Sequence, residues 1–242
     1  GENMNWFLTF LFIFYIGCTA GWIMEFFFRR AVSGHWVNPG FLVGPYLPIY
    51  GFGLTALTII YLLFRNLAVH PIIVILLMGA TMTLIEFIGG LSFVDGKGVK
   101  LWDYSNEWGN YKGIICPLFS AIWTAIAAIY YFFLASPILN LLKWFSNNLA
   151  FSFVLGVFFG VIVIDYVYST NLLKKIKKYA KENELDVKLE ELRVYIQEQQ
   201  KRRQEKYSFI LSFKQNKPLK EFLDDYKKSK STKKSFKLFR KN

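Results

Sequence analysis

Five long apolar segments constrain this chain more than any other feature of its sequence. Each has about the 20 residues that an α-helix needs to cross the roughly 30 Å hydrocarbon layer of a bilayer. Only helices and closed barrels span lipid, because hydrocarbon offers no partners to unpaired backbone groups. The sequence therefore predicts an all-α, polytopic membrane protein with five transmembrane helices. We expect the spans near residues 6–28, 45–64, 71–94, 115–135 and 150–173.

Charged residues divide the chain into two parts. Residues 174–242 carry 22 of the 29 Lys and Arg residues and 10 of the 17 Asp and Glu residues, so the formal charge of +12 belongs to this tail. We expect a neutral transmembrane domain at 4–173 and a basic cytoplasmic tail at 174–242. In the tail, apolar residues recur at helical spacing at Leu185, Leu189, Leu192 and Ile196. This predicts a helix to about residue 203 and a largely disordered remainder.

The loops between the spans differ in their basic residues. One side of the membrane would carry the tail together with Arg29, Arg30, Lys97, Lys100 and Lys112, and the other side would carry Arg65 and Lys143. Cytoplasmic loops are enriched in Lys and Arg. We therefore expect a multi-pass protein of the cell (cytoplasmic) membrane, with its N-terminus outside and its C-terminus in the cytoplasm.

Three acidic residues fall within the apolar segments, namely Glu25, Glu86 and Asp165. A charge at the bilayer centre costs at least about 2.5 kcal/mol, and such residues usually face protein or water. In the expected topology all three lie toward the cytoplasmic side. They could share a polar cavity for a cationic or hydroxyl-rich group, an ion or a proton. Alternatively, each could cap a helix end or pair with a nearby basic residue.

The segment from Asn38 to Gly51 is unusually rich in proline and glycine. Proline stands at positions 39, 45 and 48, where an ordinary helix start would tolerate one or two. Irregular backbone at membrane depth is acceptable only where protein or water surrounds it, and its free amides and carbonyls can hold a ligand. The segment therefore either lines a site or forms a tight cytoplasmic turn into a kinked helix.

A weak internal repeat links this segment to a later one. Asn38 and Pro45 are seven residues apart, as are Asn110 and Pro117. A helix with small residues on one face and an acidic residue near its end precedes each pair: Gly17, Gly21 and Glu25 in the first unit, and Gly79, Thr83 and Glu86 in the second. Two helices per unit predict a parallel repeat about an axis along the membrane normal. Chance placement of Gly, Pro and Asn is the alternative.

Two further features bear on the site. The loop segment Trp102-Asp103-Tyr104 could be an interfacial anchor or a lid over the acidic residues. In the last span, Gly156 and Gly160 are predicted to form a close-packing face that differs from the face of Asp165. The candidate substrate-binding residues are Glu25, Asn38, Gly40, Gly44, Pro45, Tyr50, Glu86, Trp102, Asp103, Tyr104, Asn110 and Asp165.

The order of these motifs resembles a known family. The matching residues are Gly21-Trp22-x-x-Glu25, Asn38-x-Gly40-Phe41-Leu42-x-Gly44-Pro45-x-x-Pro48-Ile49-Tyr50-Gly51, Glu86, Leu101 to Ser105, Asn110, Gly113 and Trp123. Over about residues 8–170, the chain resembles the bacterial "putative ABC-transporter type IV" (CmpB-like) membrane proteins. The resemblance implies a bacterial cytoplasmic-membrane protein with a permease role, and it does not cover the tail. Any ATPase would be a separate subunit, because this chain has no nucleotide-binding motif.

The leading hypothesis is an integral membrane permease-like subunit with a cytoplasm-facing acidic pocket for an unidentified substrate. Two alternatives stay open: an intramembrane enzyme that acts on a lipid-linked substrate, with the carboxylates as acid and base, and a membrane scaffold that recruits partners through its basic tail. The sequence holds no GxSxG, HExxH, P-loop or CxxC motif, which favours a protein that is not an enzyme.

The expected partners follow from the same features. They are the lipid bilayer, a separate ATPase subunit, a second copy of the chain, and anionic lipid headgroups or a cytoplasmic protein at the tail. Nucleic acid is not expected. No cofactor or metal is predicted, because His35 and His70 fall on opposite sides of the expected topology.

Overall fold

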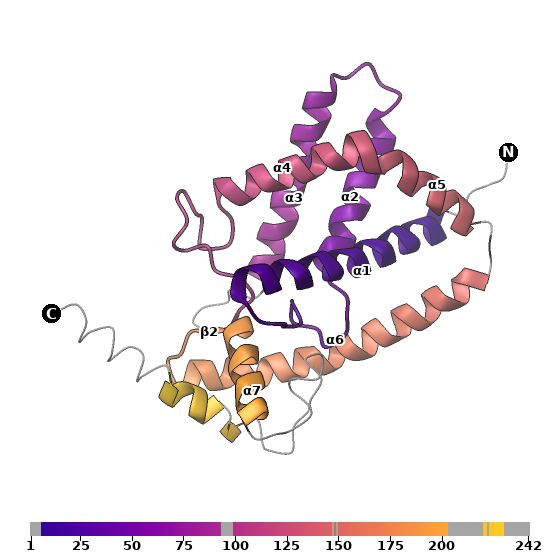
Figure 1. Ribbon diagram of the computed structural model, residues 1–242. Helices are drawn as coiled ribbons and strands as arrows, with labels where there is room; N and C mark the ends of the chain where they lie inside the picture. The colour runs from indigo at the N-terminus through magenta and orange to yellow at the C-terminus, as the bar shows by residue number, and fades with distance from the viewer. Residues whose placement is uncertain are drawn as a thin grey trace.

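Helices make up nearly all of the regular structure (Figure 1). The computed structural model describes residues 6–92, 99–146, 148, 150–202, 220–221 and 223–229. The helices are α1 (Trp6–Ser33), α2 (Pro48–Phe64), α3 (Pro71–Leu91), α4 (Pro117–Ile129), the π-helical turn η1 (Tyr130–Leu134), α5 (Ala135–Ser146), α6 (Ala150–Glu182) and α7 (Leu189–Arg202). Two short strands, β1 (Val99–Lys100) and β2 (Val187–Lys188), pair in parallel. In Figure 1 the turn between α2 and α3 projects at one end, far from α7.

Four helical segments of the described chain are long and apolar enough to cross a membrane. They are Trp6–Val32, Pro71–Leu91, Pro117–Phe145 and Ala150–Glu182. The chain is therefore an all-α membrane protein. The segment expected as the second span contains α2, which is apolar but has 17 residues. It is shorter than expected because Leu47 is extended and the helix begins at Pro48 rather than at residue 45.

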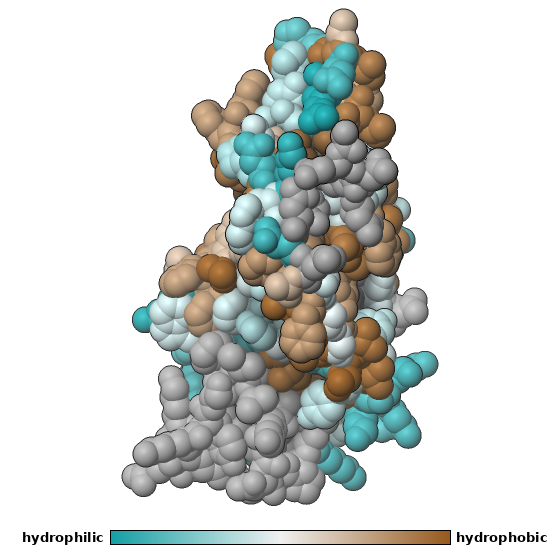
Figure 2. All heavy atoms as spheres, turned by 90° about the vertical axis from the view of Figure 1, so that its right-hand side faces the viewer, coloured by the Kyte–Doolittle hydropathy of each residue, from teal (hydrophilic) through white to brown (hydrophobic). Residues whose placement is uncertain are grey.

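The surface also fits a lipid environment. Brown, hydrophobic side chains are prominent on the face shown in Figure 2. Large apolar residues that are more than 70% exposed include Phe133, Phe153 and Ile164. Soluble proteins seldom expose large contiguous apolar patches, so these helices present a surface suited to lipid.

Glycine allows α1 and α2 to approach closely. A Cβ atom added at Gly21 would lie 2.2 Å from Cγ of Tyr50, and one added at Gly17 would lie 2.7 Å from the carbonyl oxygen of Tyr50. The second pair of helices uses the same device, since a Cβ atom at Gly79 of α3 would lie 2.2 Å from Oγ1 of Thr124 on α4. The small-residue faces seen in the sequence are therefore helix-packing faces.

We expect the substitution Gly21→Ala to destabilise the fold by about 1–3 kcal/mol, because the new methyl group must displace the Tyr50 ring. A lower apparent melting temperature of the purified protein in detergent would report this loss. The matched control is Gly156→Ala in α6, where an added Cβ atom meets nothing within 4 Å. That substitution should be neutral or slightly stabilising, because alanine favours a helix by about 1 kcal/mol over glycine. Equal melting temperatures for the two variants would contradict the packing argument.

The close-packing role expected of Gly156 and Gly160 is not fulfilled within the described chain. An added Cβ atom at either glycine meets no atom within 4 Å. Within the described residues this face of α6 therefore turns outward, and a packing partner for it stays a prediction. Asp165, as expected, points elsewhere and contacts the loop before α2.

The Asn–Pro correspondence of the proposed repeat does not extend to the structure. Helix α2 begins at Pro48, ten residues after Asn38, whereas α4 begins at Pro117, seven residues after Asn110. Asn38 is buried and accepts a hydrogen bond from Trp22, whereas Asn110 closes a largely exposed turn. The two asparagines therefore play different roles, although both precede a proline-initiated helix.

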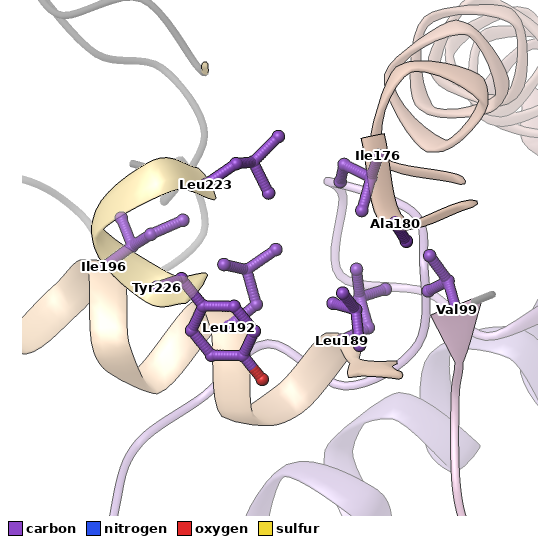
Figure 3. Packing of buried hydrophobic residues seen from close by; sticks show 9 residues of the cluster. Val99, Ile176, Ala180, Leu189, Leu192, Ile196, Leu223 and Tyr226 are labelled. Carbon is purple, nitrogen blue, oxygen red and sulfur yellow. The ribbon is translucent and has the colours of Figure 1, made fainter. Parts of the chain in front are cut away.

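The tail packs onto β1 through its own hydrophobic cluster (Figure 3). The cluster joins β1, the end of α6, β2, α7 and the helical residues 223–229 through the buried side chains of Val99, Ile176, Ala180, Val187, Leu189, Leu192, Ile196, Leu223 and Tyr226. The helix expected to end near residue 203 corresponds to α7, but it begins at Leu189, so Leu185, which was expected within it, lies in the connection between α6 and β2. The described residues between 220 and 229 are helical, although we expected this region to be disordered. Residues 203–219 and 230–242, to which the same expectation applied, lie outside the described part of the chain.

Candidate functional site

Glu25 of α1 lies at the junction of α1 and α2. One of its carboxylate oxygens, Oε1, accepts a hydrogen bond from Nε of Arg29 at 2.8 Å, and the other, Oε2, accepts one from the hydroxyl of Tyr50 at 2.7 Å. Tyr50 reaches this position because Gly21, one turn earlier on α1, leaves room for its ring. The glycine face thus positions the acidic side chain as well as the helix pair.

Glu86 of α3 is more deeply buried, with 4% of its surface exposed. Its carboxylate accepts hydrogen bonds from the Tyr104 hydroxyl at 2.9 Å and from Nε1 of Trp123 at 3.0 Å. Both donors are neutral, and no basic residue of the described chain lies within salt-bridge distance of Glu86. A buried carboxylate without a basic partner is costly to ionise. A bound cation or a proton on the carboxylate would remove this cost.

The two carboxylates line one cavity of about 160 Å³, which we call the inner cavity. Its lining consists of Glu25, Arg29, Gly40, Phe41, Leu42, Leu47, Pro48, Ile49, Tyr50, Glu86, Gly89, Leu101, Trp102, Tyr104 and Trp123. Apolar and aromatic side chains surround a few convergent polar groups, as in many small-ligand sites.

A second cavity of about 560 Å³ adjoins the first, and we call it the lateral groove. The two are neighbours, because both are lined by Glu25, Arg29, Tyr50, Leu101, Trp102, Tyr104 and Trp123. Its outer part lies between α1 and α4 and is apolar, with Met24, Phe28, Phe119, Ile122 and Ile126. Its other part reaches the charged residues Asp103, Lys188, Glu190 and Glu191.

The loop between α1 and α2 forms one wall and is held from two directions. Asn38 donates hydrogen bonds to the carbonyl oxygens of Leu42 and Val43. Asp165 of α6 accepts from the backbone amides of Val43 and Gly44, at 3.1 and 2.8 Å, and from the hydroxyl of Tyr46 at 2.5 Å. Asp165 therefore fixes the loop from outside and lines neither cavity.

Arg193 of α7 holds the same loop from the tail. Its buried guanidinium donates hydrogen bonds to the carbonyl oxygens of Asn38, Gly40 and Leu42. Burial lowers the pKa of Arg193 to about 10, so the group stays charged at neutral pH. The sequence reasoning missed this residue. A signal was present, since Arg193 lies on the same helical face as Leu189 and Ile196.

Ion pairs extend the contact between the tail and the cavity. Arg29 pairs with Glu190 as well as with Glu25, and Asp103 pairs with Lys188 at 3.1 Å and Lys100 at 3.4 Å. Burial raises the pKa of Asp103, but hydrogen bonds from Ser105 and Lys188 outweigh this and hold it below its ordinary value. The tail thus covers the charged part of the groove.

The loop between α3 and α4 supplies aromatic side chains to the site. Trp102 donates from Nε1 to the carbonyl oxygen of Ile114 at 2.8 Å, and Tyr104 stacks on Phe119 with ring centroids 4.2 Å apart. Burial and the Glu86 carboxylate raise the pKa of Tyr104 well above its ordinary value, so its hydroxyl remains a donor. Tyr104 thus links the described part of this loop to Glu86.

The structure thus brings together about half of the residues proposed from the sequence. Those that line the inner cavity or the lateral groove are Glu25, Gly40, Tyr50, Glu86, Trp102, Asp103 and Tyr104. Those that line neither are Asn38, Gly44, Pro45, Asn110 and Asp165. Arg29 and Trp123 line both cavities but were not proposed. Among the described residues, no group of three His, Cys, Asp or Glu side chains could hold a metal ion.

Comparison with known proteins gives one match. A family model described as "Putative ABC-transporter type IV" matches residues 12–170, which confirms the resemblance seen in the sequence. The match includes the two loops and the acidic residues of the site, and it stops before α7. Neither a curated protein nor a solved structure shows significant similarity to the chain.

Proposed function

This chain belongs to the putative ABC-transporter type IV family, and on that premise we propose that it is a permease-like subunit that holds its substrate in the inner cavity. The family and the apolar helices identify a membrane protein related to transport. We place it in a bacterial cytoplasmic membrane, with a separate ATPase subunit as its partner. This role would let the cavity bind the substrate while another subunit supplies the energy.

Our proposal counts α2 as a fifth span. Its 17 residues would extend about 25 Å at 1.5 Å per residue, and the turn that follows it is at the end of the molecule opposite α7 (Figure 1). An odd number of spans places the two termini on opposite sides of the membrane. With the basic tail in the cytoplasm, the N-terminus lies outside. The inner cavity then lies on the cytoplasmic side.

The environment of Glu86 is the observation that carries the proposal. The carboxylate lines the inner cavity, is 4% exposed, and has only the neutral donors Tyr104 and Trp123 as hydrogen-bond partners within the described chain. A positively charged substrate group in the cavity would compensate its charge. The aromatic lining favours the same ligand, because the faces of Trp and Tyr rings attract cations. We therefore propose a substrate with a cationic group.

Equilibrium binding of radiolabelled tetramethylammonium to the full chain in nanodiscs tests the proposal. Glu86→Gln should weaken binding at least about tenfold, since a hydrogen bond or contact to a charged group contributes roughly 1.5–3 kcal/mol. Glutamine has nearly the shape of glutamate and keeps one acceptor for Tyr104 or Trp123. The melting temperature should therefore change little.

Glu107→Gln is the matched control, because Glu107 belongs to the same loop as Tyr104 but is exposed and lines neither cavity. It should bind tetramethylammonium as tightly as the unaltered chain does. Undiminished binding by folded Glu86→Gln protein would refute the role of Glu86.

A further inference from the structure

We infer that the substrate is a lipid-like amphiphile with an ammonium headgroup, which reaches the inner cavity from the bilayer through the lateral groove. The inference rests on the proposed function, because the headgroup would occupy the same cavity. It adds the chemical class of the substrate and its route. Three features of the site support it: the lining of the inner cavity, the apolar sides of the groove, and the cover over its aqueous side.

The inner cavity suits a compact organic cation. Glu86 supplies negative charge without a basic partner in the described chain, whereas Arg29 compensates the charge of Glu25. The rings of Tyr50 and Trp123, which donate to Glu25 and Glu86, have centroids 5.9 Å apart. Trp102 adds a third aromatic side chain to the lining. Aromatic side chains next to carboxylates are a common means of binding alkylated ammonium groups. The volume of about 160 Å³ admits such a headgroup but not a whole lipid.

The lateral groove suits an alkyl chain. Its outer walls are Met24 and Phe28 on α1 and Phe119, Ile122 and Ile126 on α4. Met24, Phe28 and Ile122 are between 42% and 50% exposed, so the groove is accessible from the surface of the helices. The stretch from Phe119 to Ile126 rises about 10 Å along α4. A chain whose headgroup occupies the inner cavity could therefore continue along this wall into the hydrocarbon.

The aqueous side of the groove is the more obstructed route. Arg29 on α1 pairs with Glu190 on α7, and Asp103 in the second loop pairs with Lys188 beside α7. The hydrophobic cluster of the tail fixes α7 and β2 in this position. A substrate from water would have to displace these contacts, whereas a substrate from the bilayer would first meet the apolar side chains between α1 and α4. The geometry therefore favours a membrane-dissolved substrate.

Displacement of radiolabelled tetramethylammonium from the chain in nanodiscs tests the inference. Dodecyltrimethylammonium has the same headgroup with a single alkyl chain, and it should displace the label at a concentration at least tenfold lower than unlabelled tetramethylammonium does. Dodecyl sulfate has the same chain with an anionic headgroup and should not displace it. Displacement by dodecyl sulfate at the same concentration would overturn the inference, since the headgroup would then be irrelevant.

Ile122→Trp distinguishes the groove from simple enrichment of the amphiphile in the bilayer. The larger side chain should narrow the groove and reduce, at least tenfold, the advantage of dodecyltrimethylammonium over tetramethylammonium. Leu77→Trp on α3 is the matched control, because Leu77 is as exposed as Ile122, at 42%, but lines neither cavity. On the Leu77→Trp variant, dodecyltrimethylammonium should keep the same advantage over tetramethylammonium as on the unaltered chain.

The outcomes separate this inference from the proposed function. If dodecyltrimethylammonium has the same advantage over tetramethylammonium on Ile122→Trp as on Leu77→Trp, the lateral route is wrong. Binding of tetramethylammonium that depends on Glu86 would still support the proposed cavity in that case. If neither cation binds the folded chain, both the inference and the proposed function fail.

Discussion

Replacing Asp165 with alanine is expected to destabilise the protein by about 3 kcal/mol, because three donors lose their acceptor together. These are the backbone amides of Val43 and Gly44 and the hydroxyl of Tyr46. Ser169, on the next turn of α6, loses an acceptor as well. Unsatisfied donors that are partly buried cost roughly 1–3 kcal/mol each, and water reaching this partly exposed site would offset some of the loss. The apparent melting temperature in detergent measures the effect.

Two further variants sharpen the Asp165 experiment. Asp165→Asn keeps one carbonyl acceptor and should give an intermediate loss of stability. Asp186→Ala removes an exposed aspartate of the tail and should change stability by less than about 0.5 kcal/mol. If Asp165→Ala melted at the same temperature as Asp186→Ala, the loop would not depend on α6 for its shape.

Replacing Arg193 with methionine is expected to release α7 from the membrane domain. Methionine keeps an apolar chain of similar length but cannot donate to the carbonyl oxygens of Asn38, Gly40 and Leu42. Hydrogen bonds to a charged group contribute roughly 1.5–3 kcal/mol each, and the carbonyl oxygens would lose their charged donor. Hydrogen–deuterium exchange should show the amides of α7 exchanging roughly a hundredfold faster, since local opening controls exchange.

Lys178→Met is the control for Arg193, because Lys178 is a basic tail residue whose side chain is 79% exposed. Exchange in α7 should stay slow in this variant. Equal protection of α7 in Arg193→Met and Lys178→Met would show that the apolar cluster alone holds the tail in place. The role assigned to the guanidinium would then be wrong.

Local patterns in the sequence predicted much of the membrane domain. Apolar length identified the helices, because the requirement to span hydrocarbon leaves few other solutions. Glu25 and Glu86 could be singled out because an acidic residue in an apolar helix needs a polar neighbour. Their shared cavity follows from the glycines at positions 17, 21 and 79, which bring the helices close together. These properties depend mostly on residues within one or two helical turns.

Contacts between distant segments could not be predicted in the same way. Arg193 and Asn38 are separated by 155 residues, and Asp165 and Val43 by 122. Periodicity shows that Arg193 shares a face with leucines, but it does not show which loop that face meets. Asp165 was assigned to the cavity because its expected position along the last span was on the same side of the membrane as Glu25 and Glu86. The packing of α6 instead directs its side chain toward the backbone of the first loop. Tertiary packing decided both positions.

The parallel pairing of β1 with β2 also has a consequence for biosynthesis. A ribosome delivers the chain from its N-terminus, and domains commonly form in that order. The carboxylates and aromatic walls precede residue 124, but the strand that pairs with β1 begins at Val187 and the arginine that fixes the first loop is residue 193. While the roughly 60 residues between them are synthesised, the inner cavity of the nascent protein would lack the cover that β2 and α7 provide. The region from Val187 to Arg193 is therefore translated well after the cavity that it covers.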